Sequence, residues 1–513
     1  MNIKIDTTAK TAPTDFSWQF GMGNDHAATM LRTDMFEHVK LIHDELGIKH
    51  IRFHGIFDDD MLCYQVLSDN RNLRGLMSAK KCGTFNFHQV GQVYDNVIKA
   101  GLKPFVELSF MPKHLASGKK VGFPHSRYAN NITMPKSLAN WQEFIKQFVT
   151  FLINRYGKEE VESWLFEIWN EPDLGCFFKG KQNHYFKLYK ATAEAVKSVD
   201  KNIKVGGPST SACRWIPEFL AFCKKSGAPV DFVTTHHYPG DGFGNTFTVG
   251  DAFKMMGTSK QAAKDGLTLG TLYNKLFFKP ETYAKWHRGV LKEFDDRALR
   301  EAGNLPLYIT EWNSMAVFGA PVHDEKYSAA FIVRNVMDLE NKMSGYMLWC
   351  MSDIFEEMAL IGEPFHGSYG IVNINGIPKP NFWAIKLLSM LYPQRLLLNG
   401  KAKEGVEYAA FTDGKNVQVL LYNQSHDYNK HEKTSLTVEL NGFNGVTVYR
   451  IDDTHCNPKK VWQDMGANPY PTQEEVEAIK ERTKLVAEKI AYDGKVNLEI
   501  STNDVVMLEF IGA

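Results

Sequence analysis

The chain has 513 residues, in which 59 Lys and Arg balance 59 Asp and Glu, and 44% of the residues are hydrophobic. This is the composition of a folded globular protein long enough for more than one domain, and it excludes an intrinsically disordered chain. The formal net charge of zero gives no electrostatic reason to expect nucleic acid or an anionic membrane surface as a partner.

The cysteines and the apolar runs indicate the cellular environment. The seven cysteines are odd in number and form no Cys-x-x-Cys motif, which favours reduced, buried thiols over disulfides or a thiolate metal site. No apolar run reaches the roughly 18 residues of a membrane-spanning helix. The segment Met1–Asp6 lacks the features of a signal peptide, so the chain fits the cytoplasm, or the periplasm or exterior after removal of a leader.

Residues 16–392 alternate short apolar runs with amphipathic helical segments. Leu31, Met35, Val39, Ile42 and Leu46 lie on one helix face, and a second helix with its apolar face at 141–152 is expected to stop at Gly157. The apolar runs predict strands buried on both faces, as in a parallel sheet. These predicted strands are Phe16–Gly21, Lys49–Phe53, Lys103–Leu108, Trp164–Trp169, Ile203–Gly206, Phe232–Thr235, Leu305–Thr310 and Tyr346–Trp349.

Eight strand–helix alternations predict an α/β fold, a (β/α)8 TIM barrel spanning residues 16–392. A doubly wound sheet is the alternative, but no Gly-x-Gly-x-x-Gly follows the first predicted strand.

After residue 393 the pattern changes to short alternating runs separated by turn residues, which predicts an accessory β-sandwich domain formed by residues 393–513 together with 1–15. The run Asn2–Thr7 could add one strand to it. A charged helical insert is expected at Glu474–Lys489, with a face that is either solvated or a subunit contact in a homo-oligomer. The predicted strands of this domain are Val406–Phe411, Val417–Tyr422, Thr434–Leu440, Thr447–Ile451, Val496–Ile500 and Val505–Phe510.

Two glutamates follow the fourth and seventh predicted strands. Glu171 lies in Trp-Asn-Glu-Pro and Glu311 in Thr-Glu-Trp-Asn. Reacting groups of parallel barrels gather at the C-terminal ends of the strands, so both side chains are expected at one mouth. Paired carboxylates that flank a bond can cleave a glycoside, one as an acid on the leaving oxygen and the other as an anion that attacks the anomeric carbon. A single glutamate of this kind would more often be a surface charge, but the two together favour chemistry.

With these motifs the chain resembles glycoside hydrolase family 39, in the group typified by β-xylosidases. The resemblance covers roughly residues 16–392, and the β-rich remainder is similar in placement to the family's accessory domain. The motifs that carry it are Ile51-Arg52-Phe53-His54-Gly55, Trp169-Asn170-Glu171-Pro172, Thr235-His236-His237-Tyr238, Ile309-Thr310-Glu311, Ser352-Asp353-Ile354-Phe355-Glu356-Glu357, Pro364-Phe365-His366-Gly367 and Gly376-Ile377-Pro378-Lys379-Pro380.

The resemblance implies a retaining, exo-acting hydrolase of carbohydrate metabolism that removes terminal sugars from oligosaccharides by double displacement. Glu171 would be the general acid/base and Glu311 the nucleophile. Asn170 would donate to the sugar 2-hydroxyl, and Tyr238 would hydrogen-bond to the nucleophile. No cofactor is implied, because hydrolysis needs only water and the two carboxylates.

The resemblance also implies the substrate pocket. His54 and His236 would hold ring hydroxyls, Trp349 would form an apolar platform under the sugar, and Glu356 and Glu357 would accept hydroxyl bonds at the far end. Aromatic faces and carboxylates together suit a sugar.

Some features depart from this family or allow another interpretation. The family's xylosidases commonly have Asn where this chain has Asp173. Other specificities in the family, namely β-glucosidase, β-galactosidase, arabinosidase and α-L-iduronidase, would keep the same catalytic pair, and a carbohydrate-binding protein on a catalytically inactive barrel is a further alternative.

No metal site is predicted. His236 and His237 are adjacent in a strand and therefore point to opposite faces. Asp58-Asp59-Asp60 lacks the spaced ligands of a calcium loop and is interpreted as a solvated loop. Glu107, after the third strand, is expected to anchor the mouth through hydrogen bonds.

Overall fold

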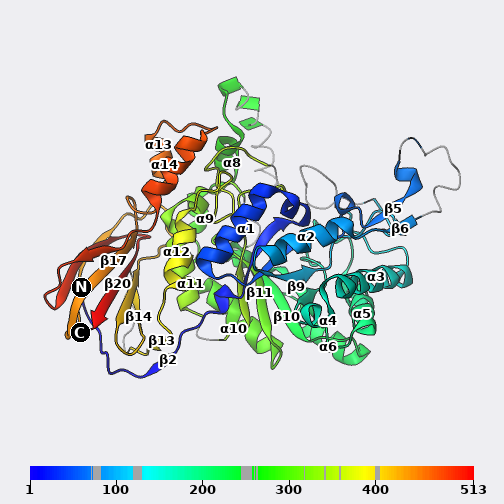
Figure 1. Cartoon of the computed structure of the whole chain (residues 1–513), viewed down its shortest axis with the longest axis horizontal. Coiled ribbons are helices and arrows are strands. Elements are labelled where there is room, and N and C mark those ends of the chain that lie inside the picture. Colours follow the sequence, from blue (N-terminus) through cyan, green and yellow to red (C-terminus); the bar gives the residue numbers. More distant parts are fainter. Residues whose placement is uncertain are drawn as a thin grey trace.

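The computed structural model describes residues 1–70, 72, 83–119, 130–243, 257–258, 260–261, 264–316, 318–339, 342–357, 360–398 and 405–512. Its central feature is a closed barrel of eight strands, in which each neighbouring pair is parallel (Figure 1). The barrel strands in chain order are β3 (Gly21–His26), β4 (His50–His54), β7 (Lys103–Glu107), β8 (Leu165–Glu167), β9 (Lys204–Thr210), β10 (Phe232–His237), β11 (Leu307–Trp312) and β12 (Gly345–Leu348). The predicted (β/α)8 barrel is confirmed.

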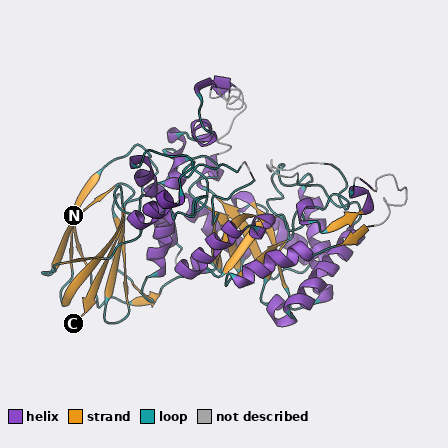
Figure 2. Ribbon diagram, turned by 45° about the horizontal axis from the view of Figure 1, so that its top comes forward, coloured by secondary structure: helices purple, strands orange, loops and turns teal. Residues whose placement is uncertain are grey.

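Helices surround the barrel strands on the outside (Figure 2). Helix α3 shows why the sequence forms them: Ser137 caps its first turn, its buried residues repeat at helical spacing, and Gly157 ends it with φ 87° as the sequence predicts. The α-helices of the barrel region are α1 (Thr33–Leu46), α2 (His88–Lys99), α3 (Leu138–Tyr156), α4 (Lys158–Glu162), α5 (Gln182–Val199), α6 (Ile216–Ser226), α8 (Leu269–Phe277), α9 (Pro280–Tyr283), α10 (Val290–Ala302), α11 (Lys326–Met337) and α12 (Pro380–Ser389).

The sequence pattern misplaced the first barrel strand. It also began the first helix face at Leu31, which is 38% exposed and lies before α1. The apolar run from Phe16 forms a short 3-10 helix at Ser17–Gln19, and β3 begins only at Gly21. The strand contains Gly-Met-Gly because its neighbours come very close: a Cβ on Gly23 would lie 2.4 Å from Cε3 of Trp349. Glycine and polar residues therefore replace the apolar run that a buried strand normally shows.

One end of the barrel interior is filled by apolar side chains and the other carries charged ones. Phe105, Leu165, Phe232 and Met347 form a buried apolar cluster, in which Leu165 and Phe232 are the first residues of β8 and β10. Arg52, Glu107 and Glu167 follow further along β4, β7 and β8, and all three are buried. Glu107 and Glu167 are the last residues of β7 and β8, so their charges lie toward the C-terminal end of the barrel, where active sites of this fold occur.

The second body is a β-sandwich that lies on the left in Figure 1, with both chain termini. Strands of its two sheets bury a shared core, in which Ile3 and Val438 of one sheet meet Val419 and Leu508 of the other. The larger sheet has the order β18 (Glu488–Ile490), β17 (Phe443–Ile451), β20 (Val505–Gly512), β15 (Val417–Tyr422), β14 (Glu407–Thr412), β13 (Gln394–Leu396) and β2 (Thr11–Pro13). The smaller one has β1 (Asn2–Lys4), β16 (Lys433–Glu439) and β19 (Lys495–Ser501).

The helical insert of the sandwich packs on the barrel. Helix α13 (Pro458–Asp464) precedes α14 (Gln473–Thr483), and Val476 and Ile479 of α14 contact Phe365 and Ile377 of the barrel. The predicted helix at 474–489 is too long, because residues 488–490 pair with β17 as an edge strand instead.

The remaining described strands, β5 (Tyr64–Val66) and β6 (Gly83–Phe85), form a small hairpin beside the barrel. None of the helices in the described part of the chain has the length and apolar character that crossing a bilayer requires.

Candidate active site

The two glutamates singled out in the sequence meet at one rim of the barrel. Glu171 lies four residues after β8 and Glu311 lies near the end of β11, yet one carboxylate oxygen of each lies within 4.8 Å of the other and of a ring nitrogen of His236. Both residues are buried, with 7% and 5% of their surface exposed. Trp169 and Glu171 have φ values of 75° and 40°, a region that is costly for non-glycine residues and that occurs most often at functional sites.

Arg52 connects the barrel interior to this rim. It is fully buried on β4, and its guanidinium lies 2.6 Å from Oε2 of Glu167, 2.8 Å from Oε2 of Glu107 and 2.8 Å from Oε1 of Glu311. Its Nη2 also donates to Oδ1 of Asn170 at 2.9 Å. A single cation thus orients a carboxylate on β11 and the amide beside Glu171.

The surroundings of Glu171 favour its protonated form. Burial raises the pKa of Glu171 well above its usual value, and the negative charges of Asp173 and Asp241 raise it further. Asp173 is itself held by Ser211, whose backbone N–H and hydroxyl donate to it at 3.0 and 2.7 Å. A carboxylic acid that stays protonated near neutral pH can deliver a proton.

Two side chains from the end of β10 contact the glutamate pair. The hydroxyl of Tyr238 donates to Oε2 of Glu311 at 3.0 Å, and Nδ1 of His236 lies 3.0 Å from Oε1 of Glu171. His237 points the other way, toward Asp295 and the hydroxyl of Tyr346, as expected of adjacent strand residues. Burial lowers the pKa of His236, so its imidazole is neutral.

His54 and Trp349 lie next to each other beside Glu311. Their rings are 4.6 Å apart between centroids, and Nε2 of His54 is 3.6 Å from Oε1 of Glu311. Nδ1 of His54 bonds Oε2 of Glu107 at 2.8 Å, so Glu107 anchors the mouth as the sequence suggested. Burial lowers the pKa of His54 to about 3, which keeps this imidazole neutral as well.

Glu356 and Glu357 follow β12, and Asp25 holds their backbone. Both amides donate to the Asp25 carboxylate, at 2.9 and 3.3 Å. The Glu356 carboxylate bonds Arg32 at 3.0 Å. Burial, followed by the negative charge of Asp25 and then by those of Glu311 and Glu171, raises the pKa of Glu357 well above its usual value.

Glu171, His236 and Glu311 are close enough together to hold a metal ion. However, Arg52 and the Tyr238 hydroxyl already donate to both oxygens of Glu311. The chemistry of the group is therefore interpreted as proton transfer and nucleophilic attack by carboxyl groups.

Sequence reasoning assigned no role to Arg52, Glu167, Asp25 or Arg32. A signal was present for Glu167, which is the one charged residue in the run 164–169, and a weaker one for Arg52, which lies between Ile51 and Phe53. A charge at such a position is buried and must have a partner. Asp25 gave no comparable signal, because its strand was placed too early in the chain.

A parallel barrel with two buried carboxyl groups at its C-terminal rim defines a barrel glycosidase, a hydrolase of O-glycosyl bonds. Comparison with known sequences narrows this class. The sequence model of the family "Glycosyl hydrolases family 39" matches residues 1–264 and 274–497. The chain belongs to glycosyl hydrolase family 39.

Known relatives and solved structures of this family cover nearly the whole chain. A beta-xylosidase from Caldicellulosiruptor saccharolyticus is 38% identical over 99% of this chain and 96% of its own length. A beta-xylosidase from Geobacillus stearothermophilus is 32% identical over 96% of this chain and 92% of its own. The crystal structure of a monomeric beta-xylosidase from Caulobacter crescentus CB15 superposes with a TM-score of 0.79 at 29% identity, over 100% of this chain and 99% of that one. The chain is thus a β-xylosidase-like glycosidase with a TIM barrel and an accessory sandwich.

Proposed function

We propose that this chain is an exo-acting β-xylosidase that cleaves terminal sugars from oligosaccharides with retention of configuration. The relatives named beta-xylosidase support the substrate class. One observation supports the mechanism above all: carboxylate oxygens of Glu171 and Glu311 lie within 4.8 Å of each other. Retaining enzymes hold their carboxyl groups roughly 5–5.5 Å apart, whereas inverting enzymes leave room for a water at roughly 6.5–9.5 Å.

In the first step Glu171 gives its proton to the glycosidic oxygen while Glu311 attacks the anomeric carbon. Nη2 of Arg52 lies 3.4 Å from Nε2 of His236. Because the guanidinium of Arg52 is always protonated, it donates the hydrogen bond and Nε2 of His236 accepts it. The ring hydrogen is then on Nδ1 and is donated to Oε1 of Glu171. This arrangement leaves Oε2 of Glu171 to carry the proton toward the substrate.

Glu311 attacks as an anion that Arg52 and Tyr238 stabilise, one on each oxygen. The resulting glycosyl ester is neutral, so a negative charge near Glu171 disappears. Glu171, now a carboxylate, takes a proton from water as the water oxygen attacks the anomeric carbon. The ester bond breaks, Glu311 regains its charge, and the sugar leaves with its original configuration.

The remaining pocket residues are proposed to bind the sugar. Trp349 offers an apolar face, Asn170 and His54 lie beside the two glutamates, and Glu356 and Glu357 take hydroxyl protons at the far end. The acidic groups at that end, Asp25 included, offer no favourable partner for the carboxylate of a uronide. This charge pattern favours a neutral sugar such as xylose over iduronic acid.

The test compares hydrolysis of a panel of nitrophenyl glycosides by the wild type, Glu311→Ala and Glu171→Ala. We expect the β-xyloside to be the best substrate, NMR to show the β-anomer as first product, and azide to rescue Glu311→Ala as the inverted α-xylosyl azide. Glu143→Ala on the exposed face of α3 is a matched control that should behave as the wild type.

Activity that survives Glu311→Ala, or a first product of inverted configuration, would refute the proposed mechanism. Preference for another glycoside with both glutamates still essential would replace the substrate but keep the mechanism. Sugar binding without turnover of any member of the panel would instead identify a carbohydrate-binding protein.

A further inference from the structure

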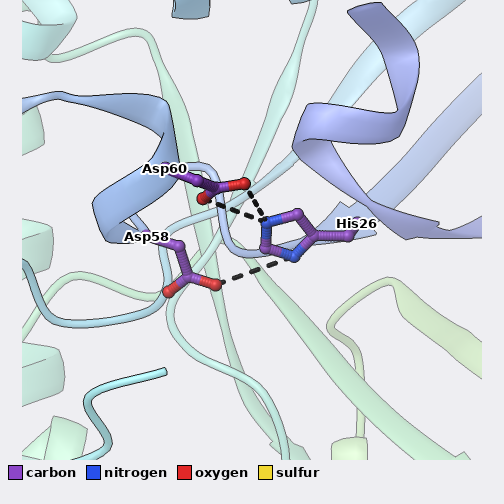
Figure 3. A group of neighbouring side chains, drawn as sticks. All are labelled: His26, Asp58 and Asp60. Carbon is purple, nitrogen blue, oxygen red and sulfur yellow. Dashed lines mark hydrogen bonds and ion pairs between the residues drawn. The ribbon is translucent and has the colours of Figure 1, made fainter. Parts of the chain in front are cut away.

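A second cluster of metal-ligating side chains lies outside the catalytic pair, where the first two barrel strands end (Figure 3). His26 is the last residue of β3, and Asp58 and Asp60 follow β4 in the next turn. The imidazole lies between the two carboxylates: Nδ1 is 3.6 Å from Oδ2 of Asp58, and Nε2 is 3.4 Å from both oxygens of Asp60. One ligand atom of each residue lies within 4.8 Å of the others.

The Asp58 carboxylate is buried and the Asp60 side chain is 20% exposed, and both have few donors around them. The sequence suggested a solvated loop at 58–60, but this is wrong for Asp58, which is 1% exposed. Both of its oxygens, and Oδ2 of Asp60, are buried without a well-formed hydrogen bond among the described residues, although the backbone N–H of Phe110 interacts weakly with Asp58. A buried carboxylate of this kind needs a cation.

The charge balance of the cluster indicates how many positive charges that cation carries. The ion pairs recorded for Asp58 and Asp60 among the described residues all involve His26. An imidazolium supplies one positive charge for two carboxylates, and Asp25 adds a third acidic group next to His26 along the chain. A divalent ion with a neutral imidazole would balance Asp58 and Asp60 completely.

We propose that His26, Asp58 and Asp60 bind a divalent transition-metal ion of the Zn²⁺ type. One imidazole nitrogen and two carboxylate oxygens are a ligand set that Zn²⁺ accepts, whereas Ca²⁺ and Mg²⁺ prefer oxygen ligands alone. The nitrogen–oxygen separations of 3.4 and 3.6 Å are longer than a good hydrogen bond. The 3.4 Å between Nε2 and the Asp60 oxygens matches the roughly 3.4 Å between two ligands of a tetrahedral ion with bonds of about 2.1 Å. Asp58 faces the other ring nitrogen, so its carboxylate has to turn toward the same ion.

The position of the site indicates a structural role. Asp58 and Asp60 lie four and six residues after His54, and the residue before His26 is Asp25, which holds the backbone of Glu356 and Glu357. An ion here would join the ends of β3 and β4 next to the sugar pocket. None of the steps proposed for the hydrolysis passes through it.

The experiment titrates the full-length chain, stripped with a chelator, with ZnCl₂ in a calorimeter. We expect one equivalent to bind, and Tm to rise by a few degrees at a free Zn²⁺ concentration about 100-fold above Kd. The isosteric variants Asp58→Asn and Asp60→Asn should weaken binding by about 10-fold or more. Asp59→Asn is the matched control: Asp59 accepts from the Lys113 amide, lies outside the cluster, and should leave binding unchanged.

Two further measurements keep the proposal open to refutation. Because Glu171, His236 and Glu311 could also take a metal, the titration is repeated on Glu311→Ala, which should still bind one equivalent. Co²⁺ in place of Zn²⁺ should give the visible absorption of a tetrahedral site with a nitrogen ligand, and His26→Gln should abolish it. The proposal is overturned if the wild type binds no Zn²⁺, if binding is lost in Glu311→Ala but kept in Asp58→Asn, or if Ca²⁺ binds as tightly as Zn²⁺.

Discussion

Removal of one hydroxyl group, in Tyr238→Phe, tests how Glu311 is prepared to act as the nucleophile. Glu311 is 5% exposed, and its two oxygens receive separate donors: Arg52 on Oε1 at 2.8 Å and the Tyr238 hydroxyl on Oε2 at 3.0 Å. The variant leaves Arg52 and the aromatic ring in place. Oε2 then loses its donor in a site that water reaches poorly.

The expected size of the effect follows from the charge of the acceptor. A hydrogen bond to an ionised group contributes about 1.5–3 kcal/mol, and about 1.4 kcal/mol corresponds to a factor of ten. Tyr238 positions the carboxylate and stabilises it along the reaction path, so we expect kcat/KM on nitrophenyl β-xyloside to fall roughly 10- to 150-fold. Tm should change little, because the ring still fills its space.

The matched control is Tyr346→Phe, which removes a buried hydroxyl that bonds Nε2 of His237 at 3.0 Å and is not bonded to either glutamate. Steady-state kinetics and thermal melts of both variants separate the loss of the hydrogen bond to Glu311 from the effect of removing any buried hydroxyl. If Tyr238→Phe lowers kcat/KM less than 3-fold, or no more than Tyr346→Phe does, the Tyr238 bond does not contribute to nucleophilic attack.

Two further predictions concern charges near the site. In Asp173→Asn one of the negative charges that raise the pKa of Glu171 is removed, so this pKa falls and the acid form is lost at lower pH. The alkaline limb of the pH profile of kcat/KM should therefore move to lower pH. The control is Asp231→Asn, just before β10 at the opposite end of the barrel, which should leave the profile unchanged. A shift to higher pH would contradict the proposal that Glu171 is the acid. In Lys379→Met the cation that lies 2.7 Å from Asp324 and 3.1 Å from Asp353 is removed from a fully buried site. Breaking such a buried pair lowers the free energy of unfolding by about 3–5 kcal/mol, so the urea midpoint should fall clearly. In the control Lys386→Met the Glu45 partner is exposed, and the loss of unfolding free energy should be at most about 1 kcal/mol. Equal midpoints for the two variants would contradict this ranking.

The sequence by itself determined the elements and the candidate catalytic pair. Apolar runs such as 103–108 and 232–235 marked buried strands because both faces of a parallel strand are covered, and residues directly after them could be examined for chemistry. The same logic misplaced the first strand. Glycines at 21 and 23 are required by close neighbours, Met347 and Trp349, that lie more than 300 residues away along the chain.

Only the tertiary structure decided which charges meet. Arg52 contacts Glu107, Glu167 and Glu311 from three other strands, and Asp58 lies buried against His26 although its own neighbours suggested a solvated loop. Local sequence sets the period and the caps of an element. The burial of a charge and the identity of its partner instead depend on the closure of the barrel, which brings the ends of distant strands to one rim.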